Sequence, residues 1–373
     1  MTLSVLFRVL SKNFSTKMSH CKLRETELIL GNSNPKFSGV TSTMLQVLEH
    51  QKELLPLAVL GKHYLPDGVR AMNFMEAVKL CRSPLPNGKA RIFHARRNNE
   101  ALQAFALKIL SPTPLKIAFT STAQREHSWI TRWIIRKADA VISTCSAAAA
   151  YIQDGPDIIS PHGVDLERYH PAIDRKKLWS ELGLPGKYGI GIFGRVRHQK
   201  GVDILVDAML PLLALFPDFT VVVCGEVTPS NKKYFDALRT KIAAAGFVER
   251  FVFLGKQPFA KIPRLFRAMH LVTALSRNEG FGLTVLEAMA SGTAVLASKA
   301  GAWEDIVRNT ETGNIVPCSD IVATKNTLEH LLSNIPKLEE MGQKGRLCAE
   351  VNYSLKNEAE LLSNFFIKLQ AAN

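Results

Sequence analysis

Residues 275–292 read LSRNEGFGLTVLEAMASG, an apolar strand end followed by a glycine-rich loop and a short helix. The glycines at 280 and 282 open backbone amides at the helix start, where N–H groups and the helix dipole favour phosphate. Glu287 falls about one turn into the helix, where a carboxylate can accept hydrogen bonds from the vicinal hydroxyls of a ribose. Glu279 lies earlier, in the loop, so it is expected to contact a different part of the ligand. A ligand with phosphates, a ribose and a further hydroxylated group is a nucleotide sugar.

A second glycine turn follows the apolar run at residues 188–193. The sequence GRVRHQKG begins at Gly194, contains Arg195 and Lys200, and leads into another helix. Arg195 can hold two phosphate oxygens through its planar guanidinium group, and Lys200 supplies a point charge. The pattern favours a phosphate site, and a solvated basic turn is the alternative interpretation.

The sequence GIGIFG at residues 189–194 matches the dinucleotide fingerprint GxGxxG. That fingerprint needs a strand before its first glycine and a helix opening at its third, whereas these glycines fall inside the apolar run itself. We therefore reject the match and expect the glycines to permit close packing. An NAD-dependent dehydrogenase stays open only as an alternative function.

Short apolar runs alternate with helical periodicity from about residue 24 onward, which predicts an α/β fold with parallel sheets covered by helices. The chain of 373 residues is long enough for two domains. Residues 182–187, LGLPGK, are rich in glycine and proline, and we place the domain linker there. The predicted strands cover 27–30, 57–60, 92–94, 116–119, 140–143, 188–193, 220–224, 251–254, 271–275 and 294–297.

The composition restricts the class of partner. Lys and Arg number 47 against 33 Asp and Glu, giving a net charge of +14, which favours polyanions or anionic membrane surfaces. Zinc-finger spacing, RNP-like aromatic stretches and basic helical repeats are absent, so nucleic acid is not expected. Six scattered cysteines argue against a disulfide framework and a structural zinc site. No apolar window approaches the ~18–20 residues of a membrane-spanning helix.

Residues 1–23 contain no acidic residue and resemble a transit peptide in composition. The simpler interpretation is an N-terminal extension or an early start codon ahead of Met18, and a weak amphipathic membrane contact is a third.

The motif GRxxxxKG followed by EGFGLxxLEAMAxG resembles the donor half of the family 4 retaining glycosyltransferases, which adopt the GT-B fold of two facing Rossmann-like domains. PHGVD at residues 161–165 and AGAWE at 300–304 extend the likeness, although Ala294 stands where a proline is usual. At the N-terminal side, GNSNPKFSGVTST at 31–43 and HARRNNE at 94–100 resemble the lipopolysaccharide core mannosyltransferases. The resemblance covers roughly residues 24–370. It implies an acceptor-binding domain over 24–184, a donor-binding domain over 185–350, and a final helix over 351–373 that crosses back to the first domain.

The resemblance also assigns roles to residues. In the donor site, Gly194, Arg195 and Lys200 would bind the diphosphate and Glu287 the ribose. Glu279, as the catalytic carboxylate, would face the transferred sugar together with the amides of Gly280, Phe281, Gly282 and Leu283. Gly39 would approach the donor phosphates or the acceptor, and His94, Arg96 and Arg97 would bind the acceptor, with a core position as the alternative for His94. His127, the second catalytic candidate, would contact the transferred sugar, with a surface histidine as the alternative.

A further hypothesis concerns positive charge in the first half of the chain. It would form a patch for acidic core sugars or lipid phosphates, with a solvated basic surface as the alternative. The residues are Arg91, Arg96, Arg97, Lys116, Arg125, Arg132, Arg136 and Lys137.

The predicted function is transfer of a hexose, favoured as mannose from GDP-mannose, to a lipopolysaccharide-core or other glycolipid acceptor. We expect no cofactor and no metal, and a cytoplasmic enzyme peripherally associated with the inner face of the membrane. The donor base is left open. The alternatives are a transferase using a UDP- or ADP-sugar, a GT-B-type nucleotide-sugar epimerase, the dehydrogenase, and a non-catalytic nucleotide-sugar binding module.

Overall fold

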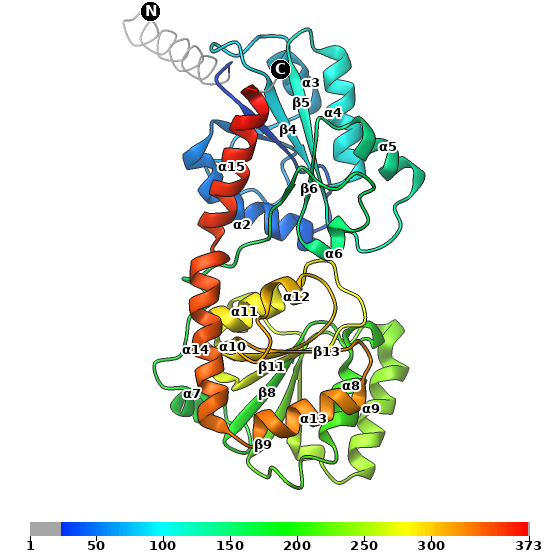
Figure 1. Cartoon of the computed structure of the whole chain (residues 1–373), viewed down its shortest axis with the longest axis vertical. Coiled ribbons are helices and arrows are strands. Elements are labelled where there is room, and N and C mark those ends of the chain that lie inside the picture. The colour runs from blue at the N-terminus through cyan, green and yellow to red at the C-terminus, as the bar shows by residue number, and fades with distance from the viewer. Residues whose placement is uncertain (1–23, 372–373) are drawn as a thin grey trace, which may run out of the picture. The chain divides into compact units, whose positions relative to one another are not determined.

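The computed structural model describes residues 24–371, which divide into two compact units (Figure 1). The first unit comprises residues 24–144, 149–160 and 356–371, and the second comprises 145–148 and 161–355. Residues 1–23, predicted as an extension, lie outside the described residues.

Each unit contains a parallel sheet, with seven strands in the first and six in the second within residues 24–371. The first sheet has the order β3-β2-β1-β4-β5-β6-β7, and the second has the order β10-β9-β8-β11-β12-β13. The strands of the first sheet are β1 (Leu28–Gly31), β2 (Leu57–Leu60), β3 (Ala71–Met72), β4 (Arg91–Ala95), β5 (Leu115–Ser121), β6 (Ala140–Ser143) and β7 (Ile158–Ile159). Those of the second are β8 (Tyr188–Phe193), β9 (Phe219–Cys224), β10 (Phe251–Gly255), β11 (Leu271–Ala274), β12 (Ala294–Ser298) and β13 (Asn314–Val316).

The two sheets share one topology, because the strand order reverses between β1 and β4 in the first unit and between β8 and β11 in the second. At such a switch point the connections diverge to opposite faces and leave a crevice at the carboxyl ends of the strands. Both units are therefore Rossmann-like, as predicted.

Helices cover both faces of each sheet. In the first unit, α3, α4 and α5 pack on one face and α2 on the other. The helices here are α2 (Gly39–Leu54), α3 (Phe74–Cys81), α4 (Asn98–Leu110), α5 (Trp129–Lys137) and, at the boundary of the units, α6 (Ser146–Ala149).

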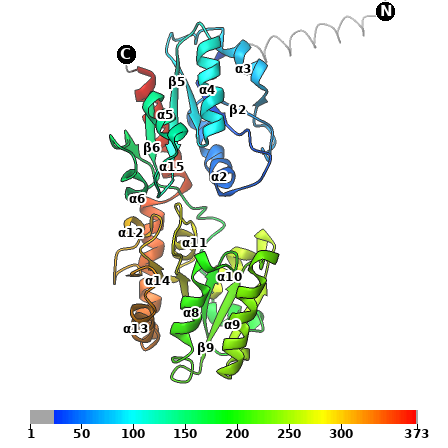
Figure 2. The same ribbon diagram turned by 90° about the vertical axis from the view of Figure 1, so that its right-hand side faces the viewer.

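In the second unit, α8 and α9 lie side by side along the sheet (Figure 2). The helices are α7 (Arg175–Glu181), α8 (Val202–Met209), α9 (Lys232–Ala244), α10 (Ile262–Ala268), α11 (Thr284–Ala290), α12 (Trp303–Ile306), α13 (Ile321–Leu332) and α14 (Ile335–Asn352).

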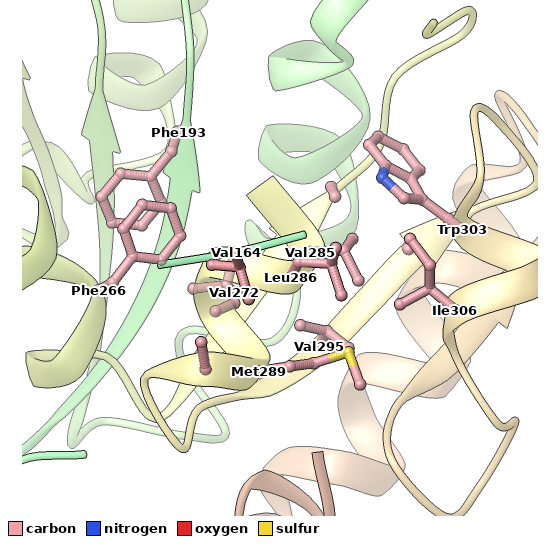
Figure 3. Close-up of a cluster of buried hydrophobic side chains, with 14 of the residues drawn as sticks. Val164, Phe193, Phe266, Val272, Val285, Leu286, Met289, Val295, Trp303 and Ile306 are labelled. Carbon is pink, nitrogen blue, oxygen red and sulfur yellow. The ribbon is translucent and has the colours of Figure 1, made fainter. Parts of the chain in front are cut away.

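A buried cluster beneath α10, α11 and α12 supports the loops that the sequence predicts to bind the donor (Figure 3). The rings of Phe193, at the end of β8, and Phe266 in α10 stack with centroids 3.9 Å apart. Trp303 in α12 and Met289 in α11 are also fully buried. Because protein interiors are densely packed, this cluster holds the end of β8 and helix α11 in fixed positions within the second unit.

The boundary between the units differs from the predicted one. Residues 161–184, which we assigned to the first domain, pack on the second. Trp179 in α7 is buried, donates to the Gly186 carbonyl over 3.1 Å, and lies against Gly189 in β8. The segment 182–187 is thus a turn that leads into β8. Glycine and proline mark a change of direction equally well in a turn and in a domain linker.

The last helix, α15 (Leu355–Ala371), belongs to the first unit and not to the second. Leu362 and Phe366 are buried in the core of the first unit with residues of α2 and β1. Lys116 Nζ in β5 donates to the Leu369 carbonyl over 3.1 Å. The helix begins at Leu355, four residues later than residue 351, the start of the predicted segment.

Glycines 189 and 191 lie within strand β8, so rejecting the dinucleotide fingerprint was correct. A Cβ at Gly189 would meet Trp179 at 2.3 Å, and a Cβ at Gly191 would meet the Phe193 ring at 2.6 Å. These glycines serve packing within the second unit.

Candidate active site

The two loops predicted to bind the donor both start at the switch point of the second sheet. One follows Phe193 at the end of β8, and the other follows Ala274 at the end of the neighbouring strand β11. Loops that leave adjacent parallel strands in opposite directions border the crevice in which Rossmann-like domains bind ligands. The topology therefore brings together segments that are 79 residues apart at Lys200 and Glu279.

Backbone and side-chain bonds join these two loops. Gln199 donates through Nε2 to the Asn278 carbonyl over 2.7 Å, and the Arg277 amide donates to the Gln199 carbonyl over 2.8 Å. Gly201 has φ +69°, and a Cβ there would lie 2.0 Å from the Leu275 carbonyl oxygen. Only glycine permits this close approach, and the loops behave as one structural element.

Arg277 and Asp203 add an ion pair across the same junction. The two guanidinium nitrogens donate to the two carboxylate oxygens over 3.0 and 2.7 Å. Tyr234 also donates to Asp203, over 2.9 Å. Burial raises the pKa of Asp203, but the hydrogen bonds from Arg277 and Tyr234 outweigh it and lower that pKa. A bidentate pair of this kind holds the loops in register.

Lys200 and Glu279 form an ion pair at the centre of the junction, between Nζ and Oε2. Each side chain is 18% exposed. Ser276 donates its hydroxyl to the same carboxylate oxygen over 3.3 Å. Gly194, with φ +126°, lies beside the Lys200 side chain, because a Cβ there would be 3.4 Å from Cε. The structure thus brings together Gly194, Lys200 and Glu279, which the sequence predicted as parts of one site.

Glu287 lies one turn into α11, and its carboxylate is held from a distant part of the chain. Tyr169 donates its hydroxyl to Oε1 over 2.9 Å. Burial raises the pKa of Glu287, although the Tyr169 hydrogen bond and the charges of Arg168 and Lys200 act in the opposite direction. Lys200 therefore acts electrostatically on both predicted carboxylates.

Arg195 takes a different position from Lys200. Its side chain is 64% exposed, and its Nε lies 3.7 Å from Oε2 of Glu226, which follows β9. A long exposed pair of this kind contributes little stability, so the guanidinium group can turn toward an anion. Arg195 and Lys200 start from the same loop but contact different carboxylates.

The loop from Gly280 to Leu283 is held by contacts of its side chains and of its carbonyl groups. Phe281 is buried and packs edge-to-face with His162 at 4.9 Å. Trp303 donates through Nε1 to the Gly282 carbonyl over 2.8 Å, and the Ala302 amide donates to the Phe281 carbonyl over 3.0 Å. Leu283 packs against the same core. These contacts fix the backbone direction at the start of α11, where amides favour phosphate.

Three supporting residues were not predicted: Tyr169, Asp203 and Trp303. Each acts through a partner far away in sequence, and no short spacing marks it. The only available signal for Tyr169 was its position just after the PHGVD motif at 161–165.

The predicted acceptor residues lie in the first unit, around its own switch point between β1 and β4. Arg97 donates to Ser38 Oγ over 2.9 Å, to Thr41 Oγ1 over 2.8 Å and to Glu100 over 2.8 Å. Ser38 caps α2, and Gly39 is the first residue of that helix. Arg97 therefore joins the loop after β1 to the loop after β4.

Arg96 and Gly39 differ in their surroundings. The Arg96 amide donates to Glu100 Oε2 over 2.9 Å. Burial lowers the pKa of Arg96 to about 10, although Glu358 and Glu100 raise it. Gly39 is exposed, and a Cβ there would meet no atom within 4 Å. Open space at Gly39 is compatible with a ligand, and Arg96 is partly buried.

His94 and His127 are both buried. His94 is 1% exposed, lies 2.7 Å from Thr120 Oγ1 through Nε2, and packs against Phe366 of α15. It does not line an acceptor cleft, because β4 directs it into the core beneath α15. His127 is 7% exposed, with Nε2 at 3.0 Å from Ser121 Oγ. It borders a cavity of about 280 Å³ within the first unit.

Two features are absent from residues 24–371. No cluster of three or more His, Cys, Asp or Glu side chains is arranged to hold a metal ion. Among the helices of this same range, none combines the length and apolar character needed to cross a bilayer.

Comparison with known proteins agrees with this geometry. The family described as "Glycosyl transferases group 1" matches residues 174–347. The lipopolysaccharide core biosynthesis mannosyltransferase LpcC of Rhizobium leguminosarum bv. viciae is 39% identical, over 94% of this chain and 99% of its own length. The corresponding enzyme LpsB of Rhizobium meliloti is 37% identical, over 93% and 99%.

Solved structures give the same result. The C-terminal domain of a group 1 glycosyltransferase (LpcC) from Francisella tularensis is 38% identical, covers 52% of this chain and 99% of that domain, and has a TM-score of 0.50. Anabaena Alr3699/HepE, solved with UDP, is 17% identical with a TM-score of 0.76 over 92% of this chain and 100% of its own, a likeness in fold. From its sequence, its two Rossmann-like units and these relatives, the chain belongs to the group 1 glycosyltransferases, the family 4 enzymes of GT-B fold.

Proposed function

We propose that this glycosyltransferase moves mannose from GDP-mannose to a lipopolysaccharide-core glycolipid, with retention at the anomeric carbon. The observation that carries the proposal is the junction at Lys200, Glu279 and Glu287, where one cation acts on two carboxylates at the start of α11. A nucleotide sugar has a diphosphate that a cation would bind and hydroxyl groups that carboxylates would bind. The named activity of the relatives that match nearly the whole chain supports mannose and a core acceptor.

The first requirement of the reaction is stabilisation of the leaving group. When the bond between the anomeric carbon and the β-phosphate oxygen breaks, its electrons pass to the phosphate. Arg195, Lys200 and the amides that open α11 would hold this charge, and preorganised donors of this kind stabilise developing charge effectively. Lys200 would then share its charge between Glu279 and the phosphate.

The second requirement is delivery of the acceptor. In a retaining transfer without an enzyme nucleophile, the acceptor hydroxyl attacks the anomeric carbon on the face from which the phosphate departs. A new carbon–oxygen bond forms, and the hydroxyl proton passes to the departing phosphate oxygen. Glu279 would position the sugar and stabilise positive charge on the anomeric carbon, and Glu287 would hold the ribose. His127 would contact the transferred sugar.

The acceptor would bind to the first unit. Arg97 connects Ser38 and Thr41 to the loop after β4, and Gly39 is exposed beside them. An acceptor with acidic core sugars or phosphates would bind beside Gly39 and compete with Glu100 for the charge of Arg97, whose side chain is 16% exposed. We therefore place the enzyme in the cytoplasm, peripherally associated with the inner face of the membrane.

We further propose that the reaction needs no metal ion, because the cationic side chains and backbone amides would neutralise the diphosphate. Addition of a chelator such as EDTA is then expected to leave the initial rate unchanged. Loss of activity that Mg²⁺ or Mn²⁺ restores would contradict this part of the proposal.

The test is a transfer assay with the purified full-length chain, GDP-mannose and a lipopolysaccharide-core acceptor lacking the terminal mannose. The expected result is acceptor-dependent release of GDP and a product heavier by one hexose in mass spectrometry. Transfer only from a UDP- or ADP-sugar would show that the donor is not GDP-mannose. Three other outcomes would contradict sugar transfer. An epimerised donor would indicate an epimerase, NADH-dependent turnover would indicate a dehydrogenase, and binding of the nucleotide sugar with no product would indicate a non-catalytic binding module.

A further inference from the structure

The predicted basic patch of the first unit separates into two groups in the structure. Arg91 is fully buried and donates to the carbonyls of Thr26 and Arg24. Arg97 donates to Glu100, Lys116 donates to the Leu369 carbonyl, and Arg96 is partly buried. The remaining members, Arg125, Arg132, Arg136 and Lys137, are exposed on or beside α5. Within the predicted patch, the charge that faces solvent is thus concentrated at one helix.

That helix also carries exposed tryptophans. Trp129 is 73% exposed and Trp133 is 38% exposed. Arg132 and Arg136 lie on the same side, because positions 129, 132, 133 and 136 follow helical spacing. The opposite side is apolar: Ile134 is buried, and Ile130 and Ile135 pack on the core. The helix therefore has an inner face for folding and a separate outer face of tryptophan and cations.

Helix α4 extends this outer face. The rings of Phe105 and Trp133 pack edge-to-face at 5.0 Å, and Asn98 Nδ2 donates to Thr131 Oγ1 over 2.9 Å. The two helices lie side by side in the first unit (Figures 1 and 2). On α4, Ile109 is 84% exposed and Leu102 is half-exposed. We call the combined region the α4–α5 surface: Leu102, Ile109, Trp129, Trp133, Arg136 and Lys137.

The acidic groups around this surface do not neutralise it. Helix α5 itself contains no acidic residue. Glu100 of α4 is buried and bound to Arg97, and Asp139 is bound to Lys108 at 2.7 Å. Glu126 precedes α5 and, with Asp154, borders the cavity of about 280 Å³ that Arg132 and Arg136 also border. The exposed cations Arg125, Arg132, Arg136 and Lys137 nevertheless outnumber these two carboxylates, so positive potential remains beside the tryptophans.

We infer that the α4–α5 surface docks this enzyme on an anionic lipid bilayer, with Trp129 and Trp133 at the headgroup level. Tryptophan prefers the membrane–water interface because its ring is apolar and its N–H is polar. Flanking cations add attraction to anionic headgroups, and apolar side chains such as Ile109 gain by leaving water. The inference deepens the proposed function, because it names the surface through which the enzyme would reach a lipid-linked acceptor.

Tryptophan fluorescence tests this directly. The chain has four tryptophans, of which Trp179 and Trp303 are buried in the second unit. Addition of vesicles with phosphatidylglycerol is expected to shift the emission to the blue and to protect it from acrylamide. Vesicles of phosphatidylcholine alone should do so at least about tenfold more weakly at low salt. An unchanged spectrum with either vesicle would overturn the inference.

Variants assign the effect to the surface. The triple variant Trp129→Ser, Arg136→Glu, Lys137→Glu is expected to lower co-sedimentation with phosphatidylglycerol vesicles by about tenfold or more. The matched control is Leu215→Ser, Lys232→Glu, Lys233→Glu, which changes an exposed apolar residue and two exposed cations in the second unit. An equal loss of vesicle binding in both triple variants would show that binding depends only on the net charge of the protein, and it would overturn the inference.

The test of the α4–α5 surface can be distinguished from the test of the proposed function. The α4–α5 variant should keep the thermal shift that GDP-mannose gives the wild type, because none of its substitutions lies in the donor loops. Absence of sugar transfer with intact vesicle binding would refute the proposed function and keep the surface. A wild-type dimer that the variant dissociates, with no vesicle binding by either protein, would instead assign the surface to a protein interface.

Discussion

Tyr169 and Glu287 lie 118 positions apart in the sequence and share a hydrogen bond of 2.9 Å. Tyr169 is buried and Glu287 is half-buried beside it, and the low solvent access of both groups raises the pKa of each. The fold therefore maintains a carboxylate in a place that is unfavourable for its charge. Such a cost is typical of a group kept for binding or catalysis.

Replacement of this carboxylate should separate stability from function. For Glu287→Gln we expect a free energy of unfolding about 1 kcal/mol higher than that of the wild type at pH 8. The amide removes the buried charge and still accepts the Tyr169 hydrogen bond. Nucleotide-sugar affinity should fall about tenfold or more, because the ribose loses a charged acceptor. Urea unfolding and calorimetric titration with GDP-mannose measure the two effects.

The pH dependence of the same variant follows from the direction of the pKa shift. The folded-state pKa of Glu287 is raised above its ordinary value, so the folded state binds the proton more tightly than the unfolded state. The contribution of Glu287 to the stability of the wild type is therefore fully present below its unfolded-state pKa, and it is lost as the pH rises through its folded-state pKa. The advantage of Glu287→Gln should therefore shrink at acidic pH, and an advantage that grows there would contradict the assignment.

Tyr169 is expected to position Glu287. Tyr169→Phe should lower the free energy of unfolding by about 1 kcal/mol, because the buried carboxylate loses a donor. Donor affinity should fall several-fold, by less than in Glu287→Gln. Tyr151→Phe is the matched control, since Tyr151 is an exposed tyrosine of the first unit. Equal donor affinity in wild type and Tyr169→Phe would show that Glu287 holds its place without the tyrosine.

The carboxylate of Glu279 should act on turnover more than on binding. Glu279→Gln is expected to lower kcat by about 100-fold or more while nucleotide affinity stays nearly intact. Lys200→Met should lower both, because Lys200 would contact the diphosphate and also holds Glu279. Lys233→Met, an exposed lysine of α9, is the control for loss of a charge. Equal losses of affinity and kcat in Glu279→Gln would refute its role at the sugar.

Much of this site was predictable because strand ends and glycine loops are local features. The strands at 57–60, 140–143 and 188–193 were predicted with the bounds of β2, β6 and β8. Edge strands β3, β7 and β13 were missed, because two or three residues carry too little periodicity. Helix α8 ends at Met209, although Leu212 and Leu213, which continue its apolar pattern, are buried in the turns that follow.

Other parts of the site depend on tertiary contacts that no spacing reveals. His94 stands at a strand end in the sequence, but α15 covers it from residues about 270 positions later through Phe366. Trp303 was noted only as part of the AGAWE motif, whereas the structure shows that it fixes the Gly282 carbonyl. The same applies to Asp203, whose partner Arg277 comes from the other loop.

Gly282 should tolerate no side chain. It has φ +84°, and a Cβ there would lie 2.5 Å from Trp303 Nε1. Gly282→Ala is expected to lower the free energy of unfolding by about 2–4 kcal/mol, the sum of backbone strain and overpacking. Gly246→Ala isolates the backbone effect, because Gly246 has φ +78° and open space around it. It should cost about 1 kcal/mol, and equal costs in the two variants would show that the loop yields to the methyl group.

The Asp203–Arg277 pair predicts how the donor loops respond to acid. Asp203→Asn should lower the free energy of unfolding at pH 7 by about 1–3 kcal/mol and weaken donor binding, because one link between the two loops is lost. Burial opposes the charge of Asp203, but Arg277 and Tyr234 lower its folded-state pKa below the ordinary value. This stabilisation is therefore present above the unfolded pKa of about 3.9 and disappears as the pH falls through the folded value.

Urea unfolding of wild type and Asp203→Asn between pH 7 and pH 3 measures that difference. The stability gap should stay constant down to about pH 5 and close below about pH 4. Asp236→Asn is the matched control, because Asp236 pairs with Lys232 on the exposed surface of α9 and should change stability by less than about 0.5 kcal/mol. A gap as large at pH 3 as at pH 7 would mean that the loops lose packing and not an ion pair, since protonation of Asp203 in the unfolded state should already have reduced the difference.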